Sequence, residues 1–325
     1  MLADRVLADL LAGRTAAVAR AISVVENGQP GFEALLAGVH PHLGRARRIG
    51  LTGPPGAGKS TLAERLVAAY RARDLSVAVV AVDPTSPFTG GALLGDRIRM
   101  EAVALDAGVF IRSMASRGSL GGLATTTREV CDLLDAAGFA RIVVETVGVG
   151  QAELDVALMA DTTALVLVPE SGDGIQTLKS GIMEAADLFV VNKADRPGAE
   201  KLGHEIEVML GIRSGGRRVR PATAWTPPVL LTNAARGDGV DPLVDALDRH
   251  HGWLVQSGEL ERRRRDRLLV RTREVVERAA RRWLWSETTA ERLVGERLGE
   301  IAEGRLSPYE VAAEIIEGLR QGERV

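Results

Sequence analysis

The stretch LTGPPGAGKST, residues 51–61, constrains the fold of this chain more than any other segment. It closes an apolar run that begins near Arg47 and leads into STLAERLVAAY, whose apolar residues recur at helical spacing. Glycines in such a turn let backbone N–H groups point inward, and the start of the following helix adds the positive end of its dipole. A strand, a glycine-rich turn and a helix in this order therefore predict a site for phosphate groups.

The spacing within this turn, G-x-x-x-x-G-K-S, matches the P-loop of nucleoside triphosphatases. Lys59 is expected to reach the β- and γ-phosphates, and the Ser60 hydroxyl is expected to ligate Mg²⁺. A coincidental match to four fixed positions has a chance on the order of 1% in a chain of this length, and the flanking strand and helix lower it further. The residues predicted to contact the nucleotide here are Gly53, Pro54, Pro55, Gly56, Ala57, Gly58, Lys59, Ser60 and Thr61.

The run FVVNKAD, residues 189–195, indicates which base the nucleotide carries. A carboxylate at Asp195 can accept hydrogen bonds from both the N1–H and the exocyclic amine of guanine, a donor pair that adenine lacks. Lys193 is expected to lie along the base, and Asn192 to tie this loop to the phosphate turn. NKAD alone is also compatible with a charged turn, but its position after a P-loop favours guanine, so GTP and GDP are the predicted ligands. A backbone contact to the guanine oxygen is expected from Thr232, Asn233 and Ala234.

The run VVETVGVGQ, residues 143–151, resembles the γ-phosphate-sensing element of GTPases, because Glu145 ends an apolar stretch and Gly148 follows it. The carboxylate can act on the Mg²⁺ shell through water, and the glycine N–H can sense the γ-phosphate. Val149 occupies the position where many GTPases place a glutamine that orients the attacking water. We therefore expect slow intrinsic hydrolysis that a partner or a rearranged loop completes, with Gln151 as a candidate substitute.

The region between residues 46 and 232 alternates short β-branched runs with helical stretches. Several of these runs are apolar without alternation, as expected for strands covered on both faces of a parallel sheet. The predicted fold is an α/β P-loop NTPase with a mostly parallel central sheet flanked by helices, with ligands at the carboxyl ends of the strands. The predicted segments are an N-terminal helical extension, a GTPase domain and a C-terminal helical extension, at residues 1–44, 45–256 and 257–325.

The last helix is predicted to begin in the stretch SPYE. Ser307 and Glu310 have the spacing of a capping box, and Pro308 stands at the first helical position, where its missing N–H is not needed. These residues therefore predict a well-defined helix start within the C-terminal extension.

Composition and charge narrow the classes of protein to which the chain can belong. It has 325 residues, of which 46% are hydrophobic and 26% charged, which is ordinary for a globular protein. The net charge of −2 argues against a nucleic-acid binder, and no apolar run approaches the roughly 18 residues that span a bilayer. The single cysteine excludes an intrachain disulfide and fits a reducing compartment. We therefore expect a cytoplasmic protein without a nucleic-acid or membrane partner.

These motifs together resemble the MeaB/ArgK-type GTPases, which include the human methylmalonic aciduria type A protein and belong to the metallochaperone GTPase group. The resemblance covers most of residues 45–240 and rests on LTGPPGAGKSTL, VAVVAVDPTSPFTGGALLGDRIRM, FIRSMASRGSLGGLA, VVETVGVGQAE and VVNKAD. It implies a GTP-hydrolysing chaperone that gates adenosylcobalamin loading and protects or reactivates a cobalamin-dependent acyl-CoA mutase, usually methylmalonyl-CoA mutase. It also implies a homodimer, with residues 257–325 in the dimer interface.

Further site residues follow from this resemblance. Asp83, after the second apolar run, is expected to approach the Mg²⁺ shell, and Asp96 to serve the metal or the first switch. The plainer alternative is that these two aspartates cap turns. Catalytic roles are expected for Lys59, Glu145 and Asp96. An additional switch is expected in SGDGIQTLKSG at Asp173, Gln176 and Lys179.

Three rival functions stay open from the sequence. A kinase of an amino-acid transport system needs a base beside a substrate hydroxyl, and no such constellation is visible. A nickel-chaperone GTPase usually carries histidine-rich tails or a Cys–His motif, whereas this chain has five histidines and one cysteine. A signal-recognition-type GTPase needs a methionine-rich domain, which six methionines spread along the chain do not supply.

Overall fold

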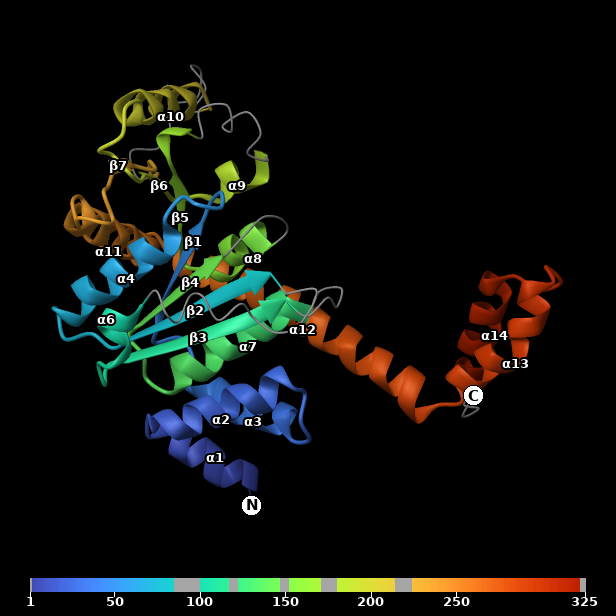
Figure 1. Ribbon diagram of the computed structural model, residues 1–325. Helices are drawn as coiled ribbons and strands as arrows, with labels where there is room; N and C mark the ends of the chain where they lie inside the picture. The colour runs from blue at the N-terminus through green and yellow to red at the C-terminus, as the bar shows by residue number, and fades with distance from the viewer. Residues whose placement is uncertain are drawn as a thin grey trace. The chain divides into compact units, whose positions relative to one another are not determined.

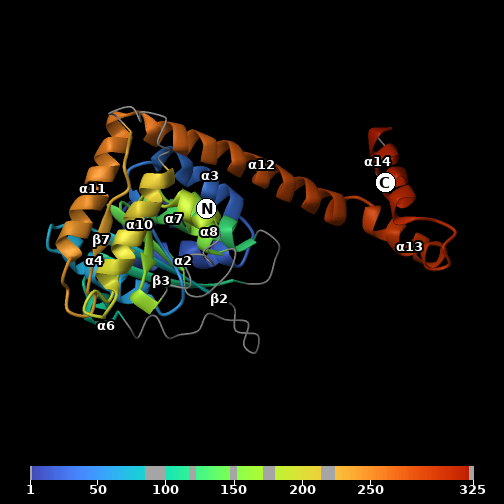
Figure 2. The ribbon, with the colours of Figure 1, turned by 90° about the horizontal axis from the view of Figure 1, so that it is seen from above.

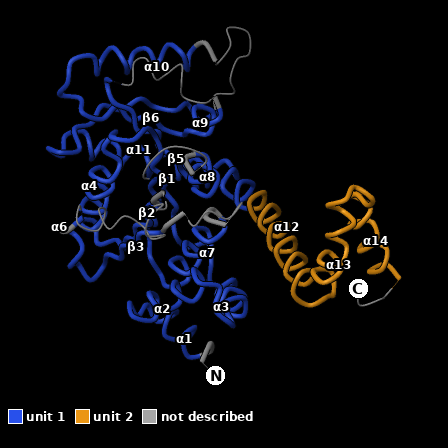
Figure 3. Tube along the Cα trace, turned by 45° about the vertical axis from the view of Figure 1, so that its right-hand side comes forward, with its two compact units in different colours: residues 1–264 blue, residues 265–325 orange. Residues whose placement is uncertain are grey.

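The structure, a computed structural model, describes residues 2–84, 100–116, 122–146, 152–170, 180–213 and 224–321. The chain forms two compact units, residues 1–264 and 265–325 (Figure 3). The N-terminal helices belong to the first unit, and the boundary between the units falls within a helix. The assignment of the three predicted segments to separate roles stays a prediction.

The described part of the first unit is built around a seven-stranded sheet (Figure 1). The strands run in the order β3-β2-β4-β1-β5-β6-β7, and every neighbouring pair is parallel. Their bounds are β1 (Arg47–Thr52), β2 (Val77–Pro84), β3 (Val109–Ser116), β4 (Arg141–Thr146), β5 (Thr162–Leu167), β6 (Leu188–Val191) and β7 (Val229–Leu231). This arrangement confirms the predicted α/β fold with a parallel sheet. The prediction rested on apolar runs in which polar and apolar residues do not alternate.

The central strand is β1, which pairs with β4 on one side and β5 on the other. Its Leu51 stands in register with Glu145 and with Ala164. Because parallel strands end at the same edge of a sheet, the carboxyl ends of β1, β4, β6 and β7 lie at one edge. In the sequence, each of these strands leads into one of the predicted nucleotide motifs.

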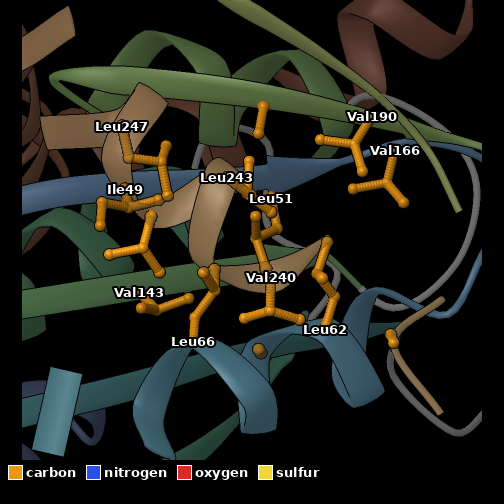
Figure 4. Close-up of a cluster of buried hydrophobic side chains, with 14 of the residues drawn as sticks. Ile49, Leu51, Leu62, Leu66, Val143, Val166, Val190, Val240, Leu243 and Leu247 are labelled. Atoms are coloured by element: carbon orange, nitrogen blue, oxygen red, sulfur yellow. The ribbon is translucent and has the colours of Figure 1, made fainter. Parts of the chain in front are cut away.

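One face of the sheet is covered by α4 (Lys59–Arg71) and α11 (Val240–Gln256), which lie side by side in Figures 1 and 2, and by the short α6 (Glu101–Ala104). Figure 4 shows aliphatic side chains of α4 and α11 among those of the strands: Ile49, Leu51, Leu62, Leu66, Val143, Val166, Val190, Val240, Leu243 and Leu247. Burying each such side chain contributes about 1.5–3 kcal/mol. This packing holds the helix that follows the phosphate turn firmly against β1.

The opposite face is covered by α7 (Gly122–Ala136) and α8 (Ala152–Met159). Three N-terminal helices, α1 (Leu2–Leu11), α2 (Thr15–Glu26) and α3 (Phe32–Val39), pack on α7 and are followed by the short 3₁₀-helix η1 at residues 40–42. Two further helices flank the β5–β7 side of the sheet: α9 (Ser180–Ala185) and α10 (Ala199–Arg213). The N-terminal helices therefore extend the same core as the sheet.

Partly buried ion pairs lie at the amino ends of β5 and β6, the opposite ends of these strands from the nucleotide motifs. Asp161 pairs with Arg264 at 2.7 Å, and Asp187 pairs with Arg263 at 3.1 Å. Burial lowers the pKa of the neighbouring His250 to about 4, so its imidazole is neutral at physiological pH. These contacts fix the first turns of α12 (Glu259–Glu287) to the sheet within the first unit.

The second unit contains the rest of α12, α13 (Ala290–Ala302) and α14 (Pro308–Arg320). Ala290, Val311 and Ile315 form its small buried core. The predicted capping box at the start of α14 is confirmed, because the Ser307 hydroxyl accepts from the backbone N–H of Glu310 while the Glu310 carboxylate accepts from that of Ser307. No helix in the described ranges is long and apolar enough to cross a lipid bilayer.

Candidate functional site

The phosphate turn, residues 53–58, joins the carboxyl end of β1 to the amino end of α4. A Cβ atom at Gly53 would overlap the carbonyl oxygen of Val166 on β5, and one at Gly58 would overlap the side-chain amide of Asn192. Both glycines also have positive φ angles, 136° and 86°. The first and last glycines of the motif are thus required by close packing as well as by backbone conformation.

The amino end of α4 is open to an anionic ligand. Gly58 stands at the N-cap, and no side chain caps the helix there. Beside Gly56, which has a φ of 74°, the turn is open, because no atom lies within 4 Å of a Cβ placed on it. Backbone N–H groups at an uncapped helix start suit phosphate oxygens, so the turn fits the predicted phosphate groups.

Lys59, the first residue of α4, is 5% exposed. Its Nζ donates to the carbonyl oxygens of Gly53, at 2.6 Å, and Pro54, at 3.0 Å. A buried ammonium group must have such partners, because desolvation of an unpaired charge is costly. The contacts hold the positive charge inside the turn, where phosphate groups are expected.

Asn192, the first residue after β6, ties the phosphate turn to the loop after β7. Its Nδ2 donates to the Ala57 carbonyl at 2.8 Å, while its Oδ1 accepts from the Thr232 hydroxyl at 3.2 Å and from the Ala234 N–H at 3.0 Å. Asn192 and Thr232 are 3% and 1% exposed. The tie expected from the sequence is confirmed, and it extends to both sides of the Asn192 amide.

The loop after β6, residues 192–195, turns sharply and sends Asp195 to the surface. Lys193 has a φ of 57°, a left-handed conformation that is uncommon for a residue with a Cβ. The Ala194 N–H donates to the Thr232 carbonyl at 2.9 Å, which binds this loop to its neighbour. Asp195 is exposed, as required of a side chain that reads a base from solution.

The loop after β7, residues 232–235, is called the base loop below. Its Asn233 N–H donates to the Asp238 carbonyl at 2.9 Å. On the side of α4, Arg65 donates through Nε to the Ala234 carbonyl at 2.9 Å and through a terminal nitrogen to the Ala235 carbonyl at 2.7 Å. Sequence reasoning missed Arg65, because a single arginine on the polar face of a helix carries no motif.

Glu145 lies on β4, in register with Leu51 of the central strand and with Ala81 of β2, and it is fully buried. Asp83 lies near the end of β2. The structure therefore brings the backbone positions of Glu145 and Asp83 to the edge where the phosphate turn begins. The remaining predicted metal, γ-phosphate and switch residues lie outside the described residues: Asp96, Gly148, Asp173, Gln176 and Lys179.

Comparison with known proteins gives a consistent match over the whole site. The family model described as "Methylmalonyl Co-A mutase-associated GTPase MeaB" matches residues 18–289, a range that contains every predicted site residue. A putative GTPase of Pyrococcus abyssi is 47% identical over 273 residues, covering 84% of this chain and 83% of the relative. The mouse methylmalonic aciduria type A homolog, a mitochondrial protein, is 33% identical over 301 residues, covering 87% and 68%.

A solved structure agrees with this match. The crystal structure of a protein described as LAO/AO transport system kinase has a TM-score of 0.70 and 30% identity to this chain. The matched region covers 98% of this chain and 97% of the chain in that crystal structure. The likeness extends over nearly the full length of both chains, helical ends included.

Proposed function

Because this chain belongs to the MeaB family of GTPases, we propose that it is a GTP-hydrolysing chaperone of an adenosylcobalamin-dependent acyl-CoA mutase. In this role it gates the loading of adenosylcobalamin and protects or reactivates the mutase, with methylmalonyl-CoA mutase as the expected client. The observation that carries the nucleotide part is the set of hydrogen bonds by which Asn192 joins the phosphate turn to the base loop. The association with methylmalonyl-CoA mutase that the family description names supports this partner.

The nucleotide is proposed to lie across the carboxyl edge of the sheet. Its phosphates bind the N–H groups of residues 53–61, and Lys59 reaches the β- and γ-phosphates. Asp195 accepts from the N1–H and amine of guanine, and the base loop donates to the guanine oxygen. The buried position of Lys59 and the rigid Asn192 tie support this placement.

The residues predicted to bind Mg²⁺ carry hydroxyl and carboxylate oxygens, which are the ligand atoms that Mg²⁺ prefers. The described residues contain no group of three or more histidine, cysteine or acidic side chains that could hold a metal ion by themselves. Mg²⁺ typically binds through one or two protein oxygens together with waters and substrate phosphates, and it neutralises charge that develops on those phosphates. We assign to its inner and outer shells Ser60, Asp83, Asp96 and Glu145.

Hydrolysis is proposed to be slow until a partner completes the site. Val149 has no polar group to orient the attacking water. The segments proposed to respond to the γ-phosphate contain Asp96, Glu145, Gly148, Asp173, Gln176 and Lys179. This arrangement suits a switch that reports its nucleotide state to the mutase.

The test is orthophosphate release from GTP and from ATP, with and without an adenosylcobalamin-dependent mutase from the same genome. We expect slow release from GTP, acceleration of about tenfold or more by the mutase, and little release from ATP. If no such mutase accelerates GTP turnover, the proposed partner is wrong. Phosphate transferred to a protein instead of released would support a kinase, and a preference for ATP would contradict the assignment of the base.

A homodimer is part of the proposal, with the C-terminal helices in the interface. The described side chains of α12 include no buried residue, and Leu269, Val276 and Trp283 recur at heptad spacing along it, 55%, 60% and 47% exposed. A stripe of this kind suits a second copy of the chain. We expect light scattering to give a dimer mass for the wild type and a monomer mass for Val276→Glu. The control is Arg281→Glu, at an exposed residue on the opposite side of α12, which is expected to leave the protein dimeric. A monomeric wild type would contradict the proposal.

A further inference from the structure

Arg65 forms a two-point contact between the helix that follows the phosphate turn and the base loop. It lies on α4, six positions after Lys59, and donates to the consecutive carbonyls of Ala234 and Ala235 at 2.9 and 2.7 Å. A guanidinium group presents its donors in a planar fork, so two bonds to neighbouring carbonyls fix the orientation of the peptide units that carry them.

The base loop is thereby held from two directions. Asn192 accepts from the Ala234 N–H on one side, and Arg65 donates to the Ala234 carbonyl on the other. Ala234 itself is 2% exposed, so its peptide units have little freedom within this clasp. The Ala234 carbonyl and the Ala235 N–H belong to one planar peptide unit, so Arg65 and Asn192 together set the direction of the Ala235 N–H.

We propose that Arg65 is a positioning residue for guanine recognition. It does not touch the nucleotide: it orients the base loop so that the Ala235 N–H meets the O6 oxygen of guanine. The inference rests on the proposed function, in which the base loop donates to that oxygen. It places the donor at Ala235, because the N–H groups of residues 232–234 already donate to the Val191 and Asp238 carbonyls and to the Asn192 side chain. It makes base selectivity depend on a side chain of the helix whose first turn binds the phosphates.

A purely structural role would have a different signature. If Arg65 only attached α4 to the loop, its loss would lower the thermal stability and would weaken all nucleotides by the same factor. If it sets the direction of the Ala235 N–H, its loss weakens most the nucleotides that use O6. Hydrogen bonds depend steeply on their angle, so a small rotation of the loop is sufficient.

The experiment compares GDP with 6-thio-GDP, which keeps the N1–H and amine that Asp195 is proposed to read but replaces O6 by a weakly accepting sulfur. Dissociation constants are measured for the full-length wild type and for Arg65→Met, which keeps the apolar stem and removes the donors. We expect Arg65→Met to bind GDP about three- to tenfold more weakly and 6-thio-GDP less than about twofold more weakly, so that the dissociation constant of 6-thio-GDP divided by that of GDP falls.

The matched control is Arg71→Met. Arg71 lies on the same helix, but its guanidinium group pairs with Asp106 at 2.9 Å and donates to the Leu75 carbonyl at 3.1 Å. Its loss is expected to leave the ratio of the two dissociation constants at the wild-type value. Should Arg65→Met not fold, Arg65→Lys takes its place: it keeps the charge without the fork, and a smaller fall in the same ratio is expected.

The outcomes separate this inference from the function on which it rests. A wild type that binds ADP as tightly as GDP would overturn the guanine assignment itself. A wild type that prefers GDP, together with an Arg65→Met variant that keeps the wild-type ratio of GDP to 6-thio-GDP affinity, would overturn only the positioning role of Arg65.

Discussion

Replacement of Lys59 by alanine is expected to lower GTP turnover by about 100-fold or more. The Lys59 ammonium is buried and held by the carbonyls of Gly53 and Pro54, inside the turn where the β- and γ-phosphates are proposed to bind. Alanine removes this charge, and with it a strong interaction with the phosphate oxygens. The measurement is orthophosphate release from GTP, with binding of a fluorescent GDP analogue in parallel.

The control for this variant is Lys201→Ala. Lys201 is exposed on α10, and its contact with Glu205 at 3.8 Å is a surface pair worth at most about 1 kcal/mol. Its turnover is expected to equal that of the wild type. Thermal unfolding of both variants distinguishes a lost site from a lost fold, and a folded Lys59→Ala protein that hydrolyses GTP at the wild-type rate would contradict the assignment of the turn.

Replacement of Asp195 by asparagine is expected to lower GDP affinity by about 100-fold while improving the binding of xanthosine diphosphate. Guanine offers two donors to the carboxylate, and each hydrogen bond to a charged group is worth about 1.5–3 kcal/mol. An asparagine amide can donate to the second carbonyl oxygen that xanthine carries in place of the amine. Competition against a fluorescent nucleotide gives both affinities.

Asp238→Asn provides the comparison for this second variant. Asp238 is also exposed and lies near the base loop, to which it contributes its backbone carbonyl, an acceptor for the Asn233 N–H. Because the backbone is unchanged, the preference for guanine is expected to stay at the wild-type level. An Asp195→Asn protein with an unaltered preference for guanine over xanthine would show that NKAD is a charged turn.

One closed path of hydrogen bonds joins the phosphate turn, the base loop and α4. The path runs from the phosphate turn through the Ala57 carbonyl to Asn192 and on to Ala234 and Arg65. It returns to α4, the helix that begins at Lys59. A displacement of either half is therefore resisted by the other, which favours a preformed site for the whole nucleotide.

Local patterns were sufficient to predict much of this protein. The phosphate turn, the parallel sheet and the capping box of α14 each depend on residues that lie close together in the chain, where periodicity and glycine, proline and cap preferences act directly. The Asn192 tie was also predictable, from the position of NKAD after an apolar run and a P-loop. The family match agrees with these predictions.

Other features depend on residues that meet only after folding. Arg65 reaches the base loop across 169 positions of the chain, and Gly53 must be glycine because of the Val166 carbonyl on a neighbouring strand. The first compact unit likewise ends at Arg264, whose pairing with Asp161 holds the first turns of α12 to the sheet. The sequence alone therefore determined the chemical type of the site and the layers around it. The tertiary structure decided which side chains hold its loops in place, because hydrogen bonds between distant segments leave no period or spacing in the chain.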